Sequence, residues 1–203
     1  MNKLAPILLS ITACIFLACS GDFKPIDFTA EEWRQNFASS DSDDFIDDRD
    51  DKTYKWVKIG EQVWMAENLN YEARGWCNGN CEIYGRLYDW TEAMTACPSG
   101  WRLPSDAEWD ALITIAGGYL EAGWVLKAKS GWEQNGNGID ELGFTALPGG
   151  FSGLNAGNSS YWWSASADDD YKAYCRAMYF DGSDVEKFAM SKSQSLSVRC
   201  IKN

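Results

Sequence analysis

Two short runs of apolar residues near residue 54 predict an antiparallel hairpin. Residues Tyr54 to Ile59 are apolar except for Lys55 and Lys58, Gly60-Glu61 follows, and the run from Gln62 to Ala66 is apolar after its first residue. Short runs rich in aromatic and β-branched residues are typical of strands, and the Gly-Glu pair supplies a turn between them. We therefore expect strands at residues 54–59 and 62–66, at the start of a folded domain.

Two capping boxes predict two short helices. Asp89-Trp-Thr-Glu92 and Ser105-Asp-Ala-Glu108 both place a capping side chain three residues before a glutamate. The first helix should end near residue 96, because Cys97-Pro98 follows. The second carries apolar residues at helical spacing from Trp109 to Ala116 and should end at Gly117-Gly118. Between the two boxes, Arg102 is expected to anchor loop carbonyls.

The second half of the chain predicts long loops followed by strands. Residues 127–143 and 151–160 are rich in Gly, Asn and Ser, whereas residues 161–166, 173–180, 185–190 and 196–201 have the composition of strands. A turn at residues 181–184 would join two of them. The order predicts an α+β domain with two helices, antiparallel strands and long loops, whose two ends can pair in one sheet.

Residues 1–18 predict a lipoprotein signal peptide. Lys3 precedes an apolar run at residues 4–17 that is too short to span a bilayer. Phe16-Leu-Ala-Cys19 looks like a bacterial lipobox, which implies cleavage before Cys19 and a lipid on that cysteine. Cys14 follows a better match in letters, but cleavage there would leave apolar residues on the mature end. Ordinary secretion is the alternative, and each interpretation places the mature chain outside the cytoplasm.

Residues 19–52 are interpreted as a flexible acidic tether. Residues 39–52 hold seven aspartates, with Arg49 and Lys52 as the only cations. Such a segment buries too little apolar surface to offset its chain entropy, so we expect it to stay extended and solvated. Calcium binding by these aspartates is the less favoured alternative, because their spacing matches no EF-hand loop. The tether would join the membrane to a domain at residues 53–203.

Composition excludes several functions. The formal net charge of −12 argues against a nucleic-acid partner, which requires a basic face. The chain has no histidine, so Ser-His and Cys-His catalytic pairs are absent. The 30 acidic residues offer many carboxylate pairs, but no spacing singles out two for glycoside hydrolysis. We therefore expect a non-enzymatic protein with no catalytic residue, metal site or cofactor.

The cysteines predict two disulfides and one free thiol. Outside the cytoplasm disulfides are the default, and Cys77-Asn-Gly-Asn-Cys81 is compatible with a local bridge on a turn. A bridge from Cys97 to Cys200 would join the helical region to the last strand. Cys175 would then remain free and pack as a small apolar side chain.

Several blocks resemble the Fibrobacter succinogenes major paralogous domain. They cover about residues 48–203 and occur in the order of the family. The family occurs in bacterial surface and secreted proteins, often lipoproteins, and its molecular role is not established. The blocks are Lys52–Tyr71, Tyr84–Trp90, Cys97–Trp109, Gly143–Gly150, Tyr161–Ser166 and Ser197–Cys200.

A more distant resemblance concerns the fold. Arg102–Trp109 and Ser197–Cys200 are similar to blocks of the formylglycine-generating, sulfatase-modifying enzymes, which implies a C-type-lectin-like fold. Those enzymes bind copper through two late cysteines, whereas here Cys200 is assigned to a bridge and Cys175 has no second thiol near it. The triplets typical of calcium-dependent lectins, such as Glu-Pro-Asn and Trp-Asn-Asp, are also missing.

The remaining hypothesis is a lipid-anchored, extracytoplasmic binding or display domain, at the outer membrane or cell surface. Its partner would be a polysaccharide or an envelope protein, because aromatic rings with Asn and Asp side chains suit sugars. The candidate ligand-binding residues are Trp162, Trp163, Asn158, Asp168 and Tyr171. Strand alternation would turn one tryptophan inward and one outward, although burial of both stays open. A structural envelope component and a divergent enzyme relative are the alternatives.

Overall fold

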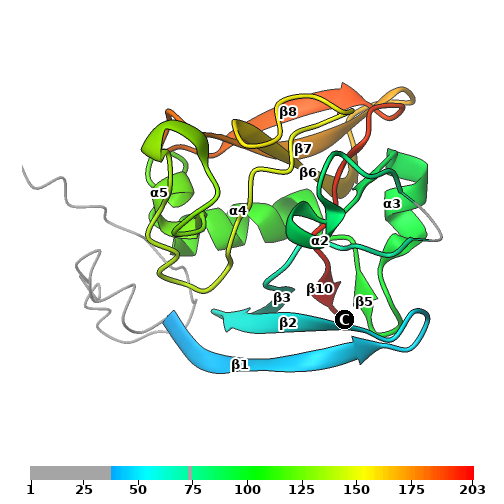
Figure 1. Ribbon diagram of the computed structural model, residues 1–203, viewed down its shortest axis with the longest axis horizontal. Coiled ribbons are helices and arrows are strands. Elements are labelled where there is room, and N and C mark those ends of the chain that lie inside the picture. Colours follow the sequence, from blue (N-terminus) through cyan, green and yellow to red (C-terminus); the bar gives the residue numbers. More distant parts are fainter. Residues whose placement is uncertain (1–37, 73–74) are drawn as a thin grey trace, which may run out of the picture.

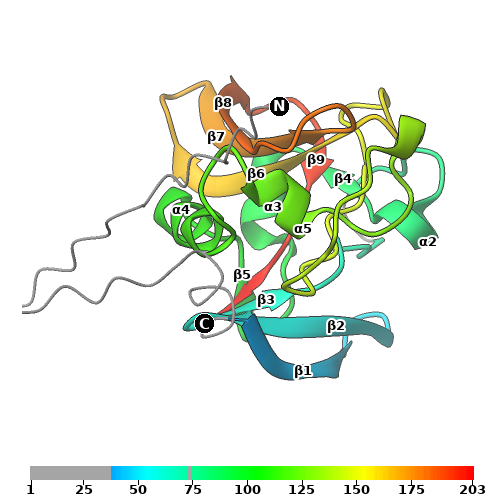
Figure 2. The ribbon, with the colours of Figure 1, turned by 90° about the vertical axis from the view of Figure 1, so that its left-hand side faces the viewer.

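The computed structural model describes residues 38–72 and 75–203, and these residues form an α+β fold, as predicted. In Figures 1 and 2, two sheets lie on opposite sides of the molecule, with α3, α4 and α5 between them. The elements are β1 Ala38–Asp47, β2 Lys52–Ile59, β3 Gln62–Met65, α2 Cys81–Tyr84, β4 Leu87–Tyr88, α3 Trp90–Ala96, β5 Trp101–Arg102, α4 Asp106–Ile115, α5 Ala122–Leu126, the 3₁₀ turn η1 Glu133–Asn135, β6 Ser159–Ala167, β7 Lys172–Tyr179, β8 Glu186–Ser191, β9 Leu196–Ser197 and β10 Ile201–Lys202.

The first sheet joins the two ends of the domain, as predicted. Its strand order is β1-β2-β3-β10-β5, so the opening hairpin pairs with the last strand. The second sheet has the order β4-β9-β6-β7-β8, with antiparallel pairing except between β6 and β9. The single strand predicted at residues 196–201 is wrong, because the chain crosses between the sheets there. Its first part belongs to one sheet and its last part to the other.

Residues 38–52 of the acidic segment are part of the fold, which corrects the flexible tether predicted there; residues 19–37 of that prediction lie outside the described residues. β1 pairs antiparallel with β2 along its length. Phe45 stacks on Tyr54 and on Trp101, with ring centroids 5.7 and 4.6 Å apart. Asp47 is 1% exposed and pairs with Arg49, at 2.6 Å between Oδ2 and Nη2. One aromatic anchor and one buried ion pair thus hold a strand of low intrinsic β-propensity. The predicted signal peptide at residues 1–18 and the predicted lipid site Cys19 lie outside the described residues.

Both predicted capping boxes are present. The side chain of Asp89 accepts a hydrogen bond from the amide of Glu92 at the start of α3, and Ser105 does the same for Glu108 at the start of α4. Two further short helices, α2 and α5, were not predicted. Both have four or five residues, too few to display a helical period.

Both predicted disulfides are confirmed, and so is the free thiol. Cys77 bridges Cys81, and Cys97 bridges Cys200 across 103 residues of sequence. Among the cysteines of residues 38–72 and 75–203, Cys175 is the one without a disulfide partner, and it is buried. Burial raises the pKa of the Cys175 thiol to about 12, so the thiol stays protonated at neutral pH.

Arg102 donates to one loop carbonyl, that of Leu103, at 3.5 Å, as the sequence suggested, but its shorter hydrogen bonds serve α4. Its Nη1 and Nη2 donate to the two carboxylate oxygens of Glu108 at 2.8 and 2.5 Å, and Glu108 also accepts from the backbone of Ser105. The hydrogen bonds from Arg102 are the main cause that lowers the pKa of Glu108 to about 2, although partial burial opposes them.

This ion pair predicts an acid-sensitive contribution to stability. Because the folded-state pKa of Glu108 is depressed, the contribution is complete above about pH 4.5 and is lost as the pH falls towards 2. Arg102 is 46% exposed, so solvent limits the effect to about 1 kcal/mol. We expect Glu108→Gln to lower the free energy of unfolding by that amount at pH 7 and by almost nothing near pH 2.

Denaturant unfolding at the two pH values measures this difference. The control is Glu61→Gln, an exposed carboxylate in the β2–β3 turn, which should change stability equally little at both pH values. An equal loss for Glu108→Gln at pH 7 and near pH 2 would contradict the assignment.

Candidate functional site

The two tryptophans of β6 are both buried, so the prediction that one faces a ligand is wrong. Trp162 and Trp163 are each 0% exposed. They do point to opposite faces of the strand, but both faces are covered. Trp162 packs in the core cluster around α4 and α5, and Trp163 packs in the cluster around α3 and β7. Their indole N–H groups donate to Asn68 Oδ1 and to the Tyr88 carbonyl. Both are therefore scaffold residues.

The other predicted contacts do not form one site. Asn158 is partly buried and lies directly before β6, whereas Asp168 and Tyr171 lie in the turn after it. The nine residues of β6 span about 30 Å. Tyr171 is 79% exposed, and Asp168 is exposed as well. The structure thus places these residues at opposite ends of a strand.

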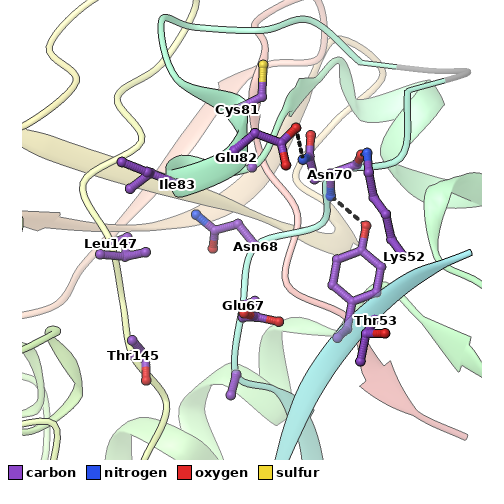
Figure 3. A pocket seen from close by; sticks show the side chains of 13 residues that line it. Lys52, Thr53, Glu67, Asn68, Asn70, Cys81, Glu82, Ile83, Thr145 and Leu147 are labelled. Carbon is purple, nitrogen blue, oxygen red and sulfur yellow. Dashed lines mark hydrogen bonds between the residues drawn. The ribbon is translucent and has the colours of Figure 1, made fainter. Parts of the chain in front are cut away.

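A polar cleft lies elsewhere, between the start of β2, the segment after β3, and α2. Its volume is about 220 Å³. Figure 3 shows Ile83, Leu147 and Thr145 on one side and Lys52 and Asn70 on the other, with Glu67 and Asn68 between them. The sequence analysis did not identify this cleft. The lining residues are Lys52, Thr53, Tyr54, Ala66, Glu67, Asn68, Asn70, Cys81, Glu82, Ile83, Gly85, Thr145 and Leu147.

Asn70 provides an unpaired acceptor in this cleft. The residue is 8% exposed, and its Oδ1 has no hydrogen-bond partner within the described chain. Its backbone is fixed from both sides, because its amide donates to Tyr54 Oη at 3.0 Å and its carbonyl accepts from Lys52 Nζ at 2.5 Å. Its Nδ2 donates to Glu82 Oε1 at 3.4 Å (Figure 3). A buried acceptor without a partner is destabilising unless a ligand or water donates to it.

Asn68 forms a rigid wall of the cleft because buried donors hold its side chain. Its Oδ1 accepts from Trp162 Nε1 at 2.8 Å and from Arg199 Nε and Nη2 at 3.1 and 2.7 Å. Its Nδ2 donates to the Tyr84 carbonyl at 2.9 Å, which ties this wall to the end of α2. Hydrogen bonds at Asn68 therefore connect the wall of the cleft to the buried core.

The charges at the cleft are mixed. Lys52 supplies one cation, and Glu67 and Glu82 supply two carboxylates. Glu67 Oε2 already accepts from the amide of Lys55 at 2.9 Å. A surface with one donor cation, carboxylates and amide oxygens suits a ligand that both donates and accepts hydrogen bonds. Hydroxyl groups do both.

The short disulfide positions α2 beside the cleft. Cys81 is the first residue of α2 and lines the cleft, and its bridge to Cys77 closes the Asn-Gly-Asn turn that precedes the helix. The backbone amides of Ile83 and Tyr84 both donate to the Asn80 carbonyl. Glu82 is thereby held opposite Asn70 by a helix too short to be stable alone.

Two negative observations hold for the described part of the chain. Within residues 38–72 and 75–203, no group of three or more His, Cys, Asp or Glu side chains is arranged to hold a metal ion. Over the same residues, no helix has the length and apolar character required to cross a bilayer.

Comparison with known proteins gives one match. The model of the Fibrobacter succinogenes major domain matches residues 57–202, which is most of the chain. No curated protein and no solved structure matches.

Proposed function

Since the chain belongs to the Fibrobacter succinogenes major domain family, we propose that it is a non-catalytic binding domain displayed outside the cytoplasm, with the polar cleft beside α2 as its ligand site. The observation that carries the proposal is Asn70, a buried side chain of the cleft whose Oδ1 receives no hydrogen bond from residues 38–72 and 75–203. The Lys52 ammonium and the Glu82 carboxylate flank it, and both bond to Asn70 itself.

The ligand class that suits this cleft best is a polysaccharide. Each sugar hydroxyl can donate to Asn70 Oδ1 or to a carboxylate, and can accept from Lys52. The formal net charge of −12 disfavours acidic polymers, so a neutral glycan is the expected partner. Display on the cell surface, through the signal peptide and a lipid on Cys19, is part of the same proposal.

We further propose that the domain has a C-type-lectin-like fold, as its similarity to formylglycine-generating enzymes implies. The pairing of β10 with β3 in one sheet supports this, because it joins the two ends of the domain. The long middle segment at residues 127–158 also fits, since it carries only a 3₁₀ turn and isolated bridges.

A protein-interaction role in the envelope is the second candidate. Tyr119, Leu120 and Trp124 are 40%, 77% and 45% exposed and lie within one short segment at α5. Exposed apolar side chains that cluster in this way are typical of protein contact surfaces.

The cleft assignment predicts loss of glycan binding in two alanine variants. Glu82→Ala and Asn70→Ala should each weaken binding of soluble neutral glucan or xylan about tenfold or more, because each removes a hydrogen bond of a charged or buried group. Glu121→Ala, an exposed acidic residue before α5, is the matched control and should bind as the wild type does.

Isothermal titration calorimetry of the full-length protein, folded with both disulfides, measures the glycan affinity of each variant. Retention of full affinity in both cleft variants would place the glycan site elsewhere. Absence of binding to every neutral glycan by folded wild-type protein would refute the polysaccharide proposal and favour the protein-interaction role.

A further inference from the structure

Trp76 is a half-exposed indole on the segment that leads into α2. Its side chain is 50% exposed, and no described residue accepts a hydrogen bond from its Nε1. The N–H groups of Trp109, Trp132, Trp162 and Trp163, which are buried, all have acceptors. Trp76 thus presents an open ring surface to solvent, and its indole N–H has no acceptor among residues 38–72 and 75–203.

The position of Trp76 is fixed by its backbone. Its amide donates to the Leu87 carbonyl at 2.6 Å, and its carbonyl accepts from the Leu87 amide at 2.8 Å. This bridge adds Trp76 to the β4 edge of the second sheet. An aromatic side chain held by a sheet edge loses little conformational entropy when a ligand stacks on it.

One side of the indole rests on a glycine turn. A Cβ atom at Gly153 would lie 2.5 Å from the Trp76 ring, so only a glycine allows this contact, and the backbone of Gly153 also has a positive φ of 86°. Because the turn supports one side of the ring, the exposed half is free for a ligand.

The cleft and Trp76 are built from the same two neighbouring chain segments. The segment from Trp76 to α2 runs beside residues 147–153: Ile83 and Leu147 both line the cleft, Asn78 Nδ2 donates to the Gly149 carbonyl at 3.1 Å, and Trp76 packs on Gly153. Asn70 and Trp76 are six positions apart in the sequence, and six residues of chain span at most about 20 Å. An extended ligand several units long can therefore reach from Asn70 to Trp76.

We propose that Trp76 forms an aromatic subsite that continues the cleft and stacks on the apolar face of a sugar unit in a neutral oligosaccharide. This inference rests on the proposed function and adds a second contact, remote from Asn70. Residues 76–80 and 147–153 of these two segments carry no charged side chain, which matches a neutral sugar: they include Asn78, Asn80 and Ser152.

Two ligands of different length test the Trp76 subsite separately from the cleft assignment. The probes are a disaccharide and a hexasaccharide of the same neutral glucan or xylan, titrated against full-length protein. We expect wild-type protein to bind the hexasaccharide more tightly than the disaccharide. Trp76→Ala should weaken hexasaccharide binding about thirtyfold, the effect of truncating an aromatic hot spot, and leave disaccharide binding unchanged.

The matched control is Trp124→Ala. Trp124 is 45% exposed, but it belongs to α5, which Figures 1 and 2 both show apart from α2. This variant should bind both probes as the wild type does. Trp76→Phe keeps a ring on Gly153 and should retain most of the hexasaccharide affinity.

Wild-type protein gives an independent readout. The indole N–H resonance of Trp76, assigned from its absence in Trp76→Phe, should shift with the hexasaccharide and not with the disaccharide. Hexasaccharide binding that leaves this resonance and the Trp76→Ala affinity unchanged would overturn the Trp76 subsite while the cleft proposal stands. A protein that binds neither probe would overturn both.

Discussion

Replacement of Cys97 and Cys200 by alanine is expected to lower the free energy of unfolding by about 4.7 kcal/mol. The bridge closes a loop with a sequence separation of 103 residues, and a cross-link of that length removes much entropy from the unfolded chain. A loss of this size is a large part of the total stability of a domain. We therefore expect the variant to be largely unfolded at 37 °C.

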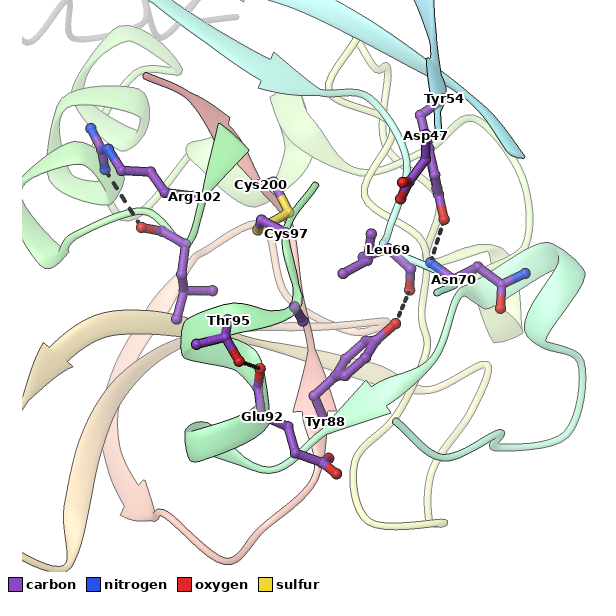
Figure 4. Close-up of a disulfide and its surroundings, with 12 residues drawn as sticks. Asp47, Tyr54, Leu69, Asn70, Tyr88, Glu92, Thr95, Cys97, Arg102 and Cys200 are labelled. Atoms are coloured by element: carbon purple, nitrogen blue, oxygen red, sulfur yellow. Dashed lines mark hydrogen bonds between the residues drawn. A yellow bond between two sulfur atoms is a disulfide. The ribbon is translucent and has the colours of Figure 1, made fainter. Parts of the chain in front are cut away.

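The location of this disulfide explains why the bridge matters to the fold. Cys97 caps the end of α3, and Cys200 lies directly before β10 (Figure 4). The same strand pairs with β3 and β5, so the bridge fixes the element that joins the two ends of the domain. The carbonyl of Cys200 also accepts from the amide of Met65 at 2.9 Å.

The second disulfide is a built-in control. Cys77 and Cys81 are only four residues apart, so the same entropy relation gives about 2 kcal/mol for their replacement by alanine. Urea unfolding of both double variants, with wild-type protein as reference, compares the two bridges. Equal losses for the two pairs would contradict the loop-length argument. A loss for Cys97 and Cys200 below about 2 kcal/mol would show that the unfolded chain is constrained in another way.

Local patterns predicted the elements whose sequence signals lie close together. Both capping boxes, the opening hairpin and the bridge between Cys77 and Cys81 each depend on residues at most a few positions apart. β1 was missed because its stability is tertiary: Phe45 stacks on Tyr54 and Trp101, and no local pattern in an aspartate-rich segment shows this.

The β6 error has a different cause. Alternation does place Trp162 and Trp163 on opposite faces, but a nearly continuous apolar run such as residues 161–163 indicates a strand covered on both faces. The apolar run at residues 161–163 was therefore the sequence feature that could have predicted the burial of both tryptophans. A strand with one solvated face would have had polar residues at alternate positions.

The cleft could not be found from sequence spacing. Its polar lining comes from Lys52, the Glu67–Asn70 segment, Glu82 and Thr145, which only the tertiary fold brings together. The polar run that follows the buried end of β3 was the one available clue. The burial of Arg199 could not be predicted from the sequence either, because arginine side chains are usually exposed.

Replacement of Arg199 by methionine is expected to lower the free energy of unfolding by about 3 kcal/mol or more, because each buried acceptor left without a donor costs about 1–3 kcal/mol. The side chain is 0% exposed and donates to Asn68 Oδ1 and to the carbonyls of Met65, Phe144 and Thr145. Burial lowers the pKa of the guanidinium, although the charges of Glu67 and Asp140 oppose this. Methionine fills similar space, but it leaves backbone acceptors buried without donors, and those acceptors cannot be removed by mutation.

The control for this variant is Arg102→Met, which removes the half-exposed partner of Glu108. It should lower the free energy of unfolding by only about 1 kcal/mol. Arg199→Lys keeps a charge, but the lysine cannot reach acceptors on several sides. It should therefore lower the free energy of unfolding by nearly as much as Arg199→Met. Denaturant unfolding measures all three variants. A loss below about 1 kcal/mol for Arg199→Met would show that water replaces the guanidinium without penalty.

Arg199 also connects stability to the proposed site. Asn68 Oδ1 receives two of its three donors from this guanidinium, and Asn68 is a wall of the cleft. Any Arg199 variant that remains folded should therefore weaken disaccharide binding as well, since the amide of Asn68 is free to turn. Trp76→Ala is predicted to leave disaccharide binding unchanged. A folded Arg199→Lys protein with unaltered disaccharide affinity would mean that Asn68 holds its orientation through Trp162 and the Tyr84 carbonyl alone.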